Sequence, residues 1–327
     1  LRVQSLTFHV AGAFTERGGL DARGCWPEAP SSELRRLMRD PAGALHLLEL
    51  KAGGSPADGD FDAVVFAQGI DAFAWACGER AAPDAPPTSP FFQRRPRFEA
   101  MRQRVRTVAT RSAQVWFDQP LHQLGWQRGT VIVAGMGVDG TAVADRGYET
   151  WADMGHLLHQ EDRAAGGQAL QAQSLAYFCG VAPAGAALAA VAPADAAAFN
   201  AAGAEPAMRE GAEAALARLL DKGMAPYWPG GGTEGTDAPA ARWKPVSQHH
   251  SLNAVGSARY TQALPGSGTA RISPLDPWCD NATLAGDWTD AGFNGGCVET
   301  AVMSGLLAAH AISGRVDLNA LVGYHHP

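Results

Sequence analysis

The sequence is poor in lysine and has no apolar run long enough to cross a bilayer. Only Lys51, Lys222 and Lys244 are lysines, so arginine carries nearly all of the positive charge, and acidic residues bring the net charge to −7. This balance argues against a dedicated nucleic-acid-binding protein and against a polybasic membrane-surface protein. The alanine-rich stretch 180–202 is interrupted by proline and charge, so we expect no transmembrane segment.

Cysteine is also scarce, and its distribution excludes a disulfide framework. The five cysteines are Cys25, Cys77, Cys179, Cys279 and Cys297. Their number is odd and no CxxC pair is present, which predicts reduced thiols in a cytoplasmic protein. Hydrophobic residues make up 46% of the chain and charged residues 18%, so it can bury a core in one large domain or two ordinary ones.

The remaining sequence predicts a chain of mixed helices and strands. Strands are expected at 2–14, 45–50, 61–69, 107–117, 130–134 and 283–285, and helices from 31, from 71, at 98–106, at 204–220 and from near 298. The almost wholly apolar run 61–69 is typical of a strand buried on both faces of a parallel sheet. Prolines cluster between Pro83 and Pro96, where we expect the chain to cross between domains.

The stretch 281–313 contains the pattern most indicative of chemistry. It reads NATLAGDWTDAGFNGGCVETAVMSGLLAAHAIS, in which a short strand ends at Gly286-Asp287, a glycine-rich turn follows and a helix begins near Val298. Glycines let the backbone approach a ligand closely, and a helix N-terminus presents free N–H groups to an electron-rich group. An ordinary strand–turn–helix unit is the alternative that the spacing alone leaves open.

This stretch resembles the C-terminal flavin-binding segment of the amine oxidase/phytoene desaturase superfamily of FAD-dependent oxidoreductases. The matching residues are Ala285-Gly286-Asp287, Gly295-Gly296, Glu299, Ala301 and Ser304-Gly305. The resemblance implies that Asp287 bonds the ribityl or pyrophosphate side of FAD, and that N–H groups near Cys297 and Val298 face the flavin pyrimidine oxygen. The residues expected to bind FAD are Gly286, Asp287, Trp288, Thr289, Asn294, Gly295, Gly296, Cys297, Val298 and Glu299.

The resemblance also implies the fold and its division. It implies an α/β (α+β) fold, with an FAD/NAD(P)-binding Rossmann-like domain, incomplete in this chain, and an interleaved mixed-sheet substrate domain. The run 61–69 looks like the family's middle strand. The expected segments are 1–50, joining the missing N-terminal FAD half to the rest; 51–80, an FAD-domain strand and helix; 81–275, the substrate domain; 276–315, the C-terminal FAD-binding segment; and 316–327, a tail.

The sequence departs from the family in its N-terminal part. No GxGxxG element, which cradles the ADP pyrophosphate, precedes Phe61. The chain opens at Leu1 without a signal-peptide pattern, so we expect a truncated or processed product, or one piece of a split enzyme. In the last case a second polypeptide carries the GxGxxG half. The literal GxGxxG at 135–140 lacks the helix and second strand that should follow, which favours a glycine-rich loop.

Two further departures concern the reaction. Cys297 stands where amine oxidases usually have an aromatic cage residue, and it is interpreted as a packing thiol or a covalent flavin anchor. The flavin-proximal lysine of the family has no evident counterpart, with Lys244 as the remaining candidate. We therefore expect an FAD-dependent oxidoreductase that oxidises a C–N or C–C bond of a small organic substrate by hydride transfer to flavin, with desaturases the nearer analogy and catalytic residues unknown. The alternative is a non-catalytic flavin-fold scaffold subunit of a larger complex.

Several other residues have a structural and a functional interpretation. His249-His250 could bind a metal, but adjacent histidines point apart and no third ligand is spaced nearby, so we expect solvated loop residues and no metal site. His156 and His159 are expected on a helix surface. The aromatic residues that could form a substrate cavity or a core are Trp116, Phe117, Trp126, Tyr177, Phe178, Tyr227 and Trp228.

Overall fold

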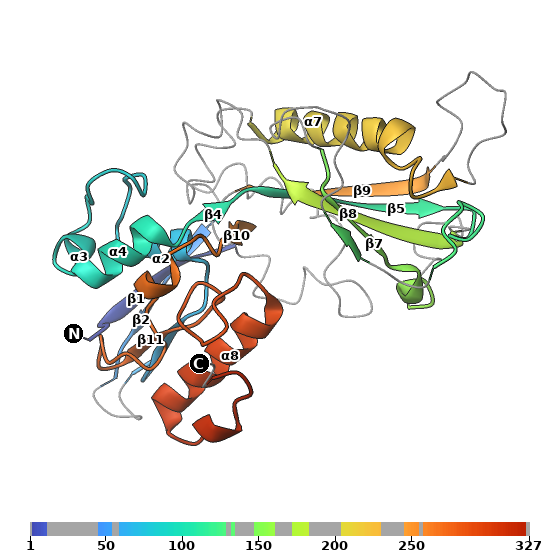
Figure 1. Cartoon of the computed structure of the whole chain (residues 1–327). Helices are drawn as coiled ribbons and strands as arrows, with labels where there is room; N and C mark the ends of the chain where they lie inside the picture. Colours follow the sequence, from blue (N-terminus) through green and yellow to red (C-terminus); the bar gives the residue numbers. More distant parts are fainter. Residues whose placement is uncertain are drawn as a thin grey trace.

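The computed structural model describes residues 2–11, 45–53, 59–128, 132–134, 147–160, 172–182, 204–229, 245–254 and 258–324. These residues form a mixed α/β structure in two lobes, the helical lobe and the sheet lobe (Figure 1). The helical lobe contains β1 (Ser5–Ala11), β2 (Leu45–Lys51), β3 (Val64–Phe66), α2 (Ile70–Ala76), α3 (Pro90–Gln93), α4 (Pro96–Arg104), β11 (Ala282–Leu284) and α8 (Val298–Ser313). The sheet lobe contains β5 (Thr110–Phe117), β6 (Ile132–Ala134), β7 (Thr150–Asp153), β8 (Ser174–Val181), α7 (Ala204–Arg218) and β9 (Pro245–Asn253).

The core of the helical lobe is aromatic and is built around Phe73, which is fully buried. The aromatic side chains whose rings contact Phe73 are Phe66, Phe91, Phe92, Phe98, Trp278 and Trp288. β3 and β11 pair in parallel beside this core. The expected strand in 61–69 is confirmed in its parallel pairing, although it is shorter than the apolar run. The expectation that it is buried on both faces is wrong, because Val65 is 42% exposed and only Val64 of the three strand residues is buried.

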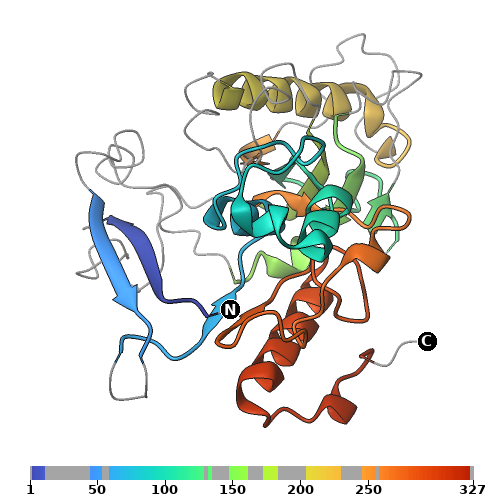
Figure 2. The same ribbon diagram turned by 90° about the vertical axis from the view of Figure 1, so that its left-hand side faces the viewer.

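The N-terminal strands form an antiparallel pair, β1 with β2, at one side of the helical lobe, as Figure 2 shows. The start of the described chain is joined to β11 by the Asn281 side chain, which accepts a hydrogen bond from the Val3 amide (2.8 Å) and donates one to the Val3 carbonyl (3.0 Å). Both strands were predicted from the sequence, within a few residues of their observed bounds. Among the helices in the described ranges, none combines the length and the apolar surface needed to cross a bilayer.

The sheet lobe is a five-stranded antiparallel sheet with the strand order β6-β7-β8-β5-β9. In β5 every second side chain is buried, which is the pattern of a strand with only one face in the core. α7 lies along that face in Figure 1, and its last turn continues into a short π-helix, Leu219–Gly223. Ala215 and Leu216 of the helix pack with Val115 and Phe117 of the strand, which confirms the predicted amphipathic helix.

The two lobes are joined through β4 (Thr107–Val108) and β10 (Tyr260–Thr261), which pair with each other. The single strand expected at 107–117 is divided at Ala109, because β4 pairs with β10 while β5 enters the sheet. Asp71 of α2 accepts a hydrogen bond from the Thr107 hydroxyl and lies 3.6 Å from Nε of Arg259, next to β10. This polar cluster fixes the crossing strands to the helical lobe.

The proline-rich stretch, where we expected the crossing, leads into α3 and α4. Phe92, Phe98 and Met101 of these helices share the buried core of Phe73. Proline occupies the first turn of both helices, where its missing N–H is tolerated. The chain then passes to the other lobe through β4.

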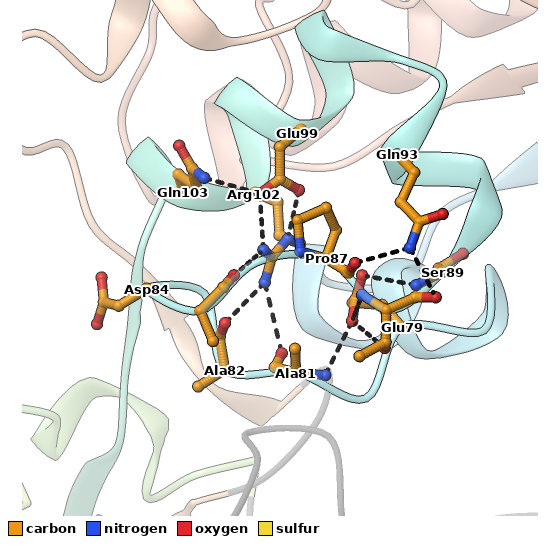
Figure 3. Close-up of polar contacts among 12 residues, drawn as sticks. Glu79, Ala81, Ala82, Asp84, Pro87, Ser89, Gln93, Glu99, Arg102 and Gln103 are labelled. Atoms are coloured by element: carbon orange, nitrogen blue, oxygen red, sulfur yellow. Dashed lines mark hydrogen bonds and ion pairs between the residues drawn. The ribbon is translucent and has the colours of Figure 1, made fainter.

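The loop that leads into α3 is fixed by two buried charged side chains (Figure 3). The Glu79 carboxylate accepts hydrogen bonds from the Ala81 amide (2.8 Å) and from the amide (3.1 Å) and hydroxyl (2.6 Å) of Thr88. The Arg102 guanidinium bonds Glu99 and three main-chain carbonyls of the loop, those of Ala81, Ala82 and Ala85. Burial alone would raise the pKa of Glu79, but these donors lower it from 4.5 to about 2.

This depressed pKa predicts acid sensitivity. The ionised Glu79 stabilises the fold fully above its unfolded-state pKa of 4.5, and this contribution is lost as the pH falls through about 2. At about 1.4 kcal/mol per pKa unit it amounts to about 3 kcal/mol. Glu79→Gln should therefore lower the free energy of unfolding at pH 7 and flatten its fall below pH 4.5, as measured by urea denaturation at several pH values. An equal pH profile for Glu79→Gln and the unmodified protein would contradict this, and the exposed Asp62→Asn is the control.

Candidate functional site

The loop that follows β11 begins at Gly286, whose backbone conformation only glycine adopts readily. Gly286 has φ of +133°, and a Cβ there would lie 2.5 Å from Nε1 and 2.7 Å from Cδ1 of Trp288. The Gly286 amide donates a hydrogen bond of 2.9 Å to Oγ of Ser304 in α8. The glycine of the sequence motif therefore lets the strand turn sharply against the helix.

Two buried hydroxyl groups lock this loop to α8. The Thr289 and Ser304 hydroxyls are 2.7 Å apart, and both side chains are inaccessible to solvent. The Thr289 hydroxyl also lies 2.9 Å from the Gly286 carbonyl, to which it can donate. Ser304 of the final helix thus positions the loop through its contacts with Gly286 and Thr289.

Trp288 was expected among the FAD-binding residues, and its side chain lies in the core. Its indole is fully buried, stacks on Phe73 with ring centroids 5.6 Å apart, and donates to the Gln68 carbonyl at 2.9 Å. The side chain of Thr289 is equally buried. The side chains at these two positions are therefore not available to a ligand, and the main chain of Thr289 is bonded to Gly286 and Arg271.

Asp287 differs from its neighbours because its carboxylate points out of the core. It is half-buried, and Oδ1 accepts a hydrogen bond of 2.8 Å from the Thr261 hydroxyl. Thr261 lies in β10, so the strand that connects the lobes also orients this acid. An oriented carboxylate suits the binding of ligand hydroxyl groups.

The glycine turn before α8 packs closely against β10. A Cβ on Gly296 would lie 2.3 Å from the Thr261 carbonyl oxygen and 2.9 Å from the ring of Tyr260. The Asn294 side chain closes the turn by accepting a hydrogen bond of 3.3 Å from the Ala291 amide. The expected residues Asn294, Gly295 and Gly296 therefore form one compact turn against β10, next to the N-terminus of α8.

The N-terminus of α8 is open to an incoming group. Its N-cap residue, Cys297, makes no side-chain capping hydrogen bond, and Val298 in the first turn is 75% exposed. Hydrogen bonds from its own amide and from Cys297 lower the pKa of Glu299, which is also exposed. The positive end of this 16-residue helix favours an anion or an oxygen that gains negative charge.

Tyr260 connects this site to the sheet lobe. Its side chain is 50% exposed, and burial, then the nearby Asp287, Cys297 and Cys179, raise its pKa. Cys179 lies on β8, on the second face of the sheet, opposite α7. The ring of Tyr260 adjoins Gly296 in the turn before α8.

The second face of the sheet consists mostly of uncharged side chains that can form hydrogen bonds. The strand register aligns them in two rows, Ser251–Ser112–Cys179–Thr150 and His249–Gln114–Tyr177–Ala152. Most of these side chains are half-buried, and the rows contain no Asp, Glu, Lys or Arg. This face is suited to a neutral polar ligand.

Several residues singled out in the sequence have structural roles. His249 and His250 do point to opposite sides, but they lie in β9 and not in a loop, and buried His250 contacts the Tyr148 hydroxyl at 3.3 Å. His156 and His159 are exposed on a 3₁₀ turn and its end, not on a regular helix. Within the described ranges no group of three potential metal ligands occurs.

The aromatic candidates divide between the two faces of the sheet. Phe117, Phe178 and Trp228 are core residues, with Trp126 and Tyr227 packed against them, whereas Trp116 and Tyr177 point to the second face. Lys244 and the GxGxxG at 135–140 lie outside the described residues. Thr261 and Tyr260 were not predicted, because nothing in the spacing of 255–274 distinguishes them from an ordinary extended segment.

Comparison with known proteins identifies a family for most of the chain. The chain matches the family described as flavin-containing amine oxidoreductase over residues 31–313, which is well over half of its length. A search of curated proteins finds no match. The matched span includes both β3 and the complete β11–α8 unit.

Proposed function

The chain belongs to the flavin-containing amine oxidoreductase family, and we propose that it is an FAD-dependent oxidoreductase that oxidises a C–N or C–C bond of a small organic substrate. The observation that carries this proposal is the β11–α8 unit, in which a constrained loop, an outward carboxylate and an uncapped helix N-terminus adjoin one another. We also propose that the helical lobe is part of a Rossmann-like FAD-binding domain and that the sheet lobe is the substrate domain.

The residues of this unit fit an FAD molecule. A Cβ at Gly286 would overlap Trp288 and one at Gly296 would overlap the Thr261 carbonyl, so both glycines hold the loop and the turn close to the rest of the protein, beside the outward Asp287 carboxylate. Asp287 would accept hydrogen bonds from the ribityl or pyrophosphate side. The Val298 N–H would face the pyrimidine oxygen, whereas the Cys297 N–H, which was also expected there, donates to the Gly295 carbonyl at 3.0 Å. Bound FAD supplies the two-electron acceptor for hydride removal, and the α8 dipole favours the negative charge that develops on reduction.

We propose that the substrate binds against the second face of the sheet. The uncharged hydrogen-bonding rows there support a neutral polar substrate over an apolar polyene. Oxidation of a C–N bond is then favoured over desaturation of a hydrocarbon. Anaerobic mixing with neutral amines and with apolar alkenes tests this choice, because only a true substrate bleaches the visible flavin bands.

A second polypeptide that carries the GxGxxG half of the FAD-binding domain remains part of the proposal. No GxGxxG element precedes Phe61 in these 327 residues. Within the described residues, β3 and β11 form a sheet of only two parallel strands, whereas parallel sheets normally have more strands and helices on both faces. A denaturing gel with intact-mass analysis decides: a single flavin-loaded polypeptide would contradict this proposal.

The non-catalytic scaffold is the second candidate, and the cysteine at position 297 favours it. An aromatic cage residue is expected there in an amine oxidase, and Cys297 contacts Thr300 of its own helix instead, at 3.2 Å. A scaffold that retains the fold would either lack flavin or hold flavin that no substrate reduces. The same anaerobic experiment separates the two candidates.

A further inference from the structure

Arg271 is a buried arginine that bonds the main chain of the Gly286–Thr289 loop. Arg271 directly follows a short 3₁₀ helix, Gly268–Ala270, and is only 4% exposed. One terminal nitrogen donates to the carbonyl oxygens of Asp287 (2.5 Å) and Thr289 (3.3 Å), and the other lies 3.5 Å from the carbonyl oxygen of Gln262. The guanidinium therefore links Gln262, in the segment after β10, to the residues directly before and after Trp288.

The positive charge of Arg271 has no ion-pair partner among the described residues. All of its hydrogen-bond acceptors are main-chain carbonyls, and its buried Nε has no hydrogen-bond partner there. Burial lowers the pKa of Arg271, while the more distant Asp287 and Asp290 act in the opposite direction. Buried cations are normally paired because desolvation is costly, so an unpaired one beside a ligand-binding loop suits a ligand that is, or becomes, anionic.

We propose that Arg271 is a positioning residue for the flavin, which holds the Gly286–Thr289 loop in its binding conformation and favours the reduced cofactor through its positive charge, which no ion pair among the described residues neutralises. This inference rests on the proposed function. Reduction adds negative charge to the flavin, and a cation in a poorly screened interior acts on that charge without direct contact. The guanidinium fork provides the loop geometry, whereas the charge alone provides the electrostatic effect.

Arg102 provides a matched control for a purely structural role. It is equally buried and also donates to three main-chain carbonyls of one loop, but it is paired with Glu99 at 2.7 Å and lies in the α4 region, away from α8. Its replacement should destabilise the protein without changing the properties of bound flavin.

The test compares Arg271→Met, Arg271→Lys and Arg102→Met in the natively purified protein, with any chain that co-purifies. Added FAD is titrated into flavin-depleted protein, and the midpoint potential of bound flavin is measured by dye equilibration. Arg271→Met should weaken FAD binding about tenfold. It should also weaken the preference for reduced over oxidised flavin by a further tenfold, which lowers the midpoint potential of a two-electron couple by about 30 mV. Arg271→Lys should weaken binding but retain the potential, because the charge remains.

The outcomes separate this inference from the proposed function. If Arg271→Met binds FAD with unchanged affinity and potential, as expected for Arg102→Met, the role of Arg271 is refuted while the function stands. If Arg271→Met fails to fold, Arg271→Lys decides. An unchanged affinity of Arg271→Lys for FAD would refute the role of Arg271 in holding the loop, and a lowered midpoint potential would refute the role of its charge. If the unmodified protein binds no FAD, the proposed function fails and this inference with it.

Discussion

Asp287→Ala is expected to lower the flavin content of the purified protein at least tenfold while leaving its fold largely intact. The carboxylate is half-buried, and the structure gives it one protein partner, the Thr261 hydroxyl. In the proposed site the carboxylate accepts hydrogen bonds from FAD. Each hydrogen bond to a charged group contributes about 1.5–3 kcal/mol, so losing it should lower flavin binding at least tenfold. The ratio of flavin to protein absorbance measures the loss, and circular dichroism measures the fold.

Asp290 provides the control for this substitution because it is an acid in the same loop. Its amide donates to the Ile272 carbonyl, and this main-chain bond is retained in Asp290→Ala, so that variant should keep its flavin. Glu299→Ala, at the start of α8, should lower flavin content as Asp287→Ala does, or displace the start of the helix. If both Asp287→Ala and Glu299→Ala retained full flavin, the site assignment would be wrong.

Gly286→Ala is expected to cost about 3 kcal/mol or more of folding stability, because backbone strain and a core clash add. The residue has φ of +133°, and the new methyl group would overlap the Trp288 indole at 2.5 Å. That indole cannot move away easily, since it is fully buried against Phe73 and bonded to the Gln68 carbonyl. Urea denaturation measures the loss, and a shift in tryptophan emission would report the displacement of Trp288.

Gly305→Ala in α8 is the matched glycine substitution. Nothing lies within 4 Å of a Cβ at that position, and alanine is favoured over glycine inside a helix by about 0.5–1 kcal/mol. This variant should therefore be at least as stable as the unmodified protein. Equal stability of Gly286→Ala and Gly305→Ala would show that the loop does not have the described geometry.

The β11–α8 unit was predictable because its residues are contiguous in the sequence. The strand, the glycine turn and the helix start at Val298 all lie where the motif indicates. The orientation of side chains within it was not predictable in the same way. Trp288 is adjacent to Asp287 and yet points into the core, because the turn at Gly286 places the indole against Phe73.

The residues that support the unit were missed because they are distant in sequence. Thr261 and Arg271 lie 26 and 16 residues before Asp287, in a segment without helical or strand periodicity, and only the pairing of β10 with β4 brings them to the loop. The division of the strand at Ala109 has the same origin, since alternation continues through it while the pairing partners change. Local pattern predicted the elements of the β11–α8 unit and the helix α7, but it missed β7, β8 and β9, whose pairing in the sheet is non-local.

An absorption spectrum of the natively purified protein, beside a denaturing gel of the same sample, distinguishes the oxidoreductase from the scaffold. We expect flavin bands together with a second, co-purifying polypeptide. The absence of flavin, even after FAD and a GxGxxG-bearing partner are added, would contradict this expectation. The β11–α8 unit would then be a retained fold element, and the scaffold function would stand in place of the oxidoreductase.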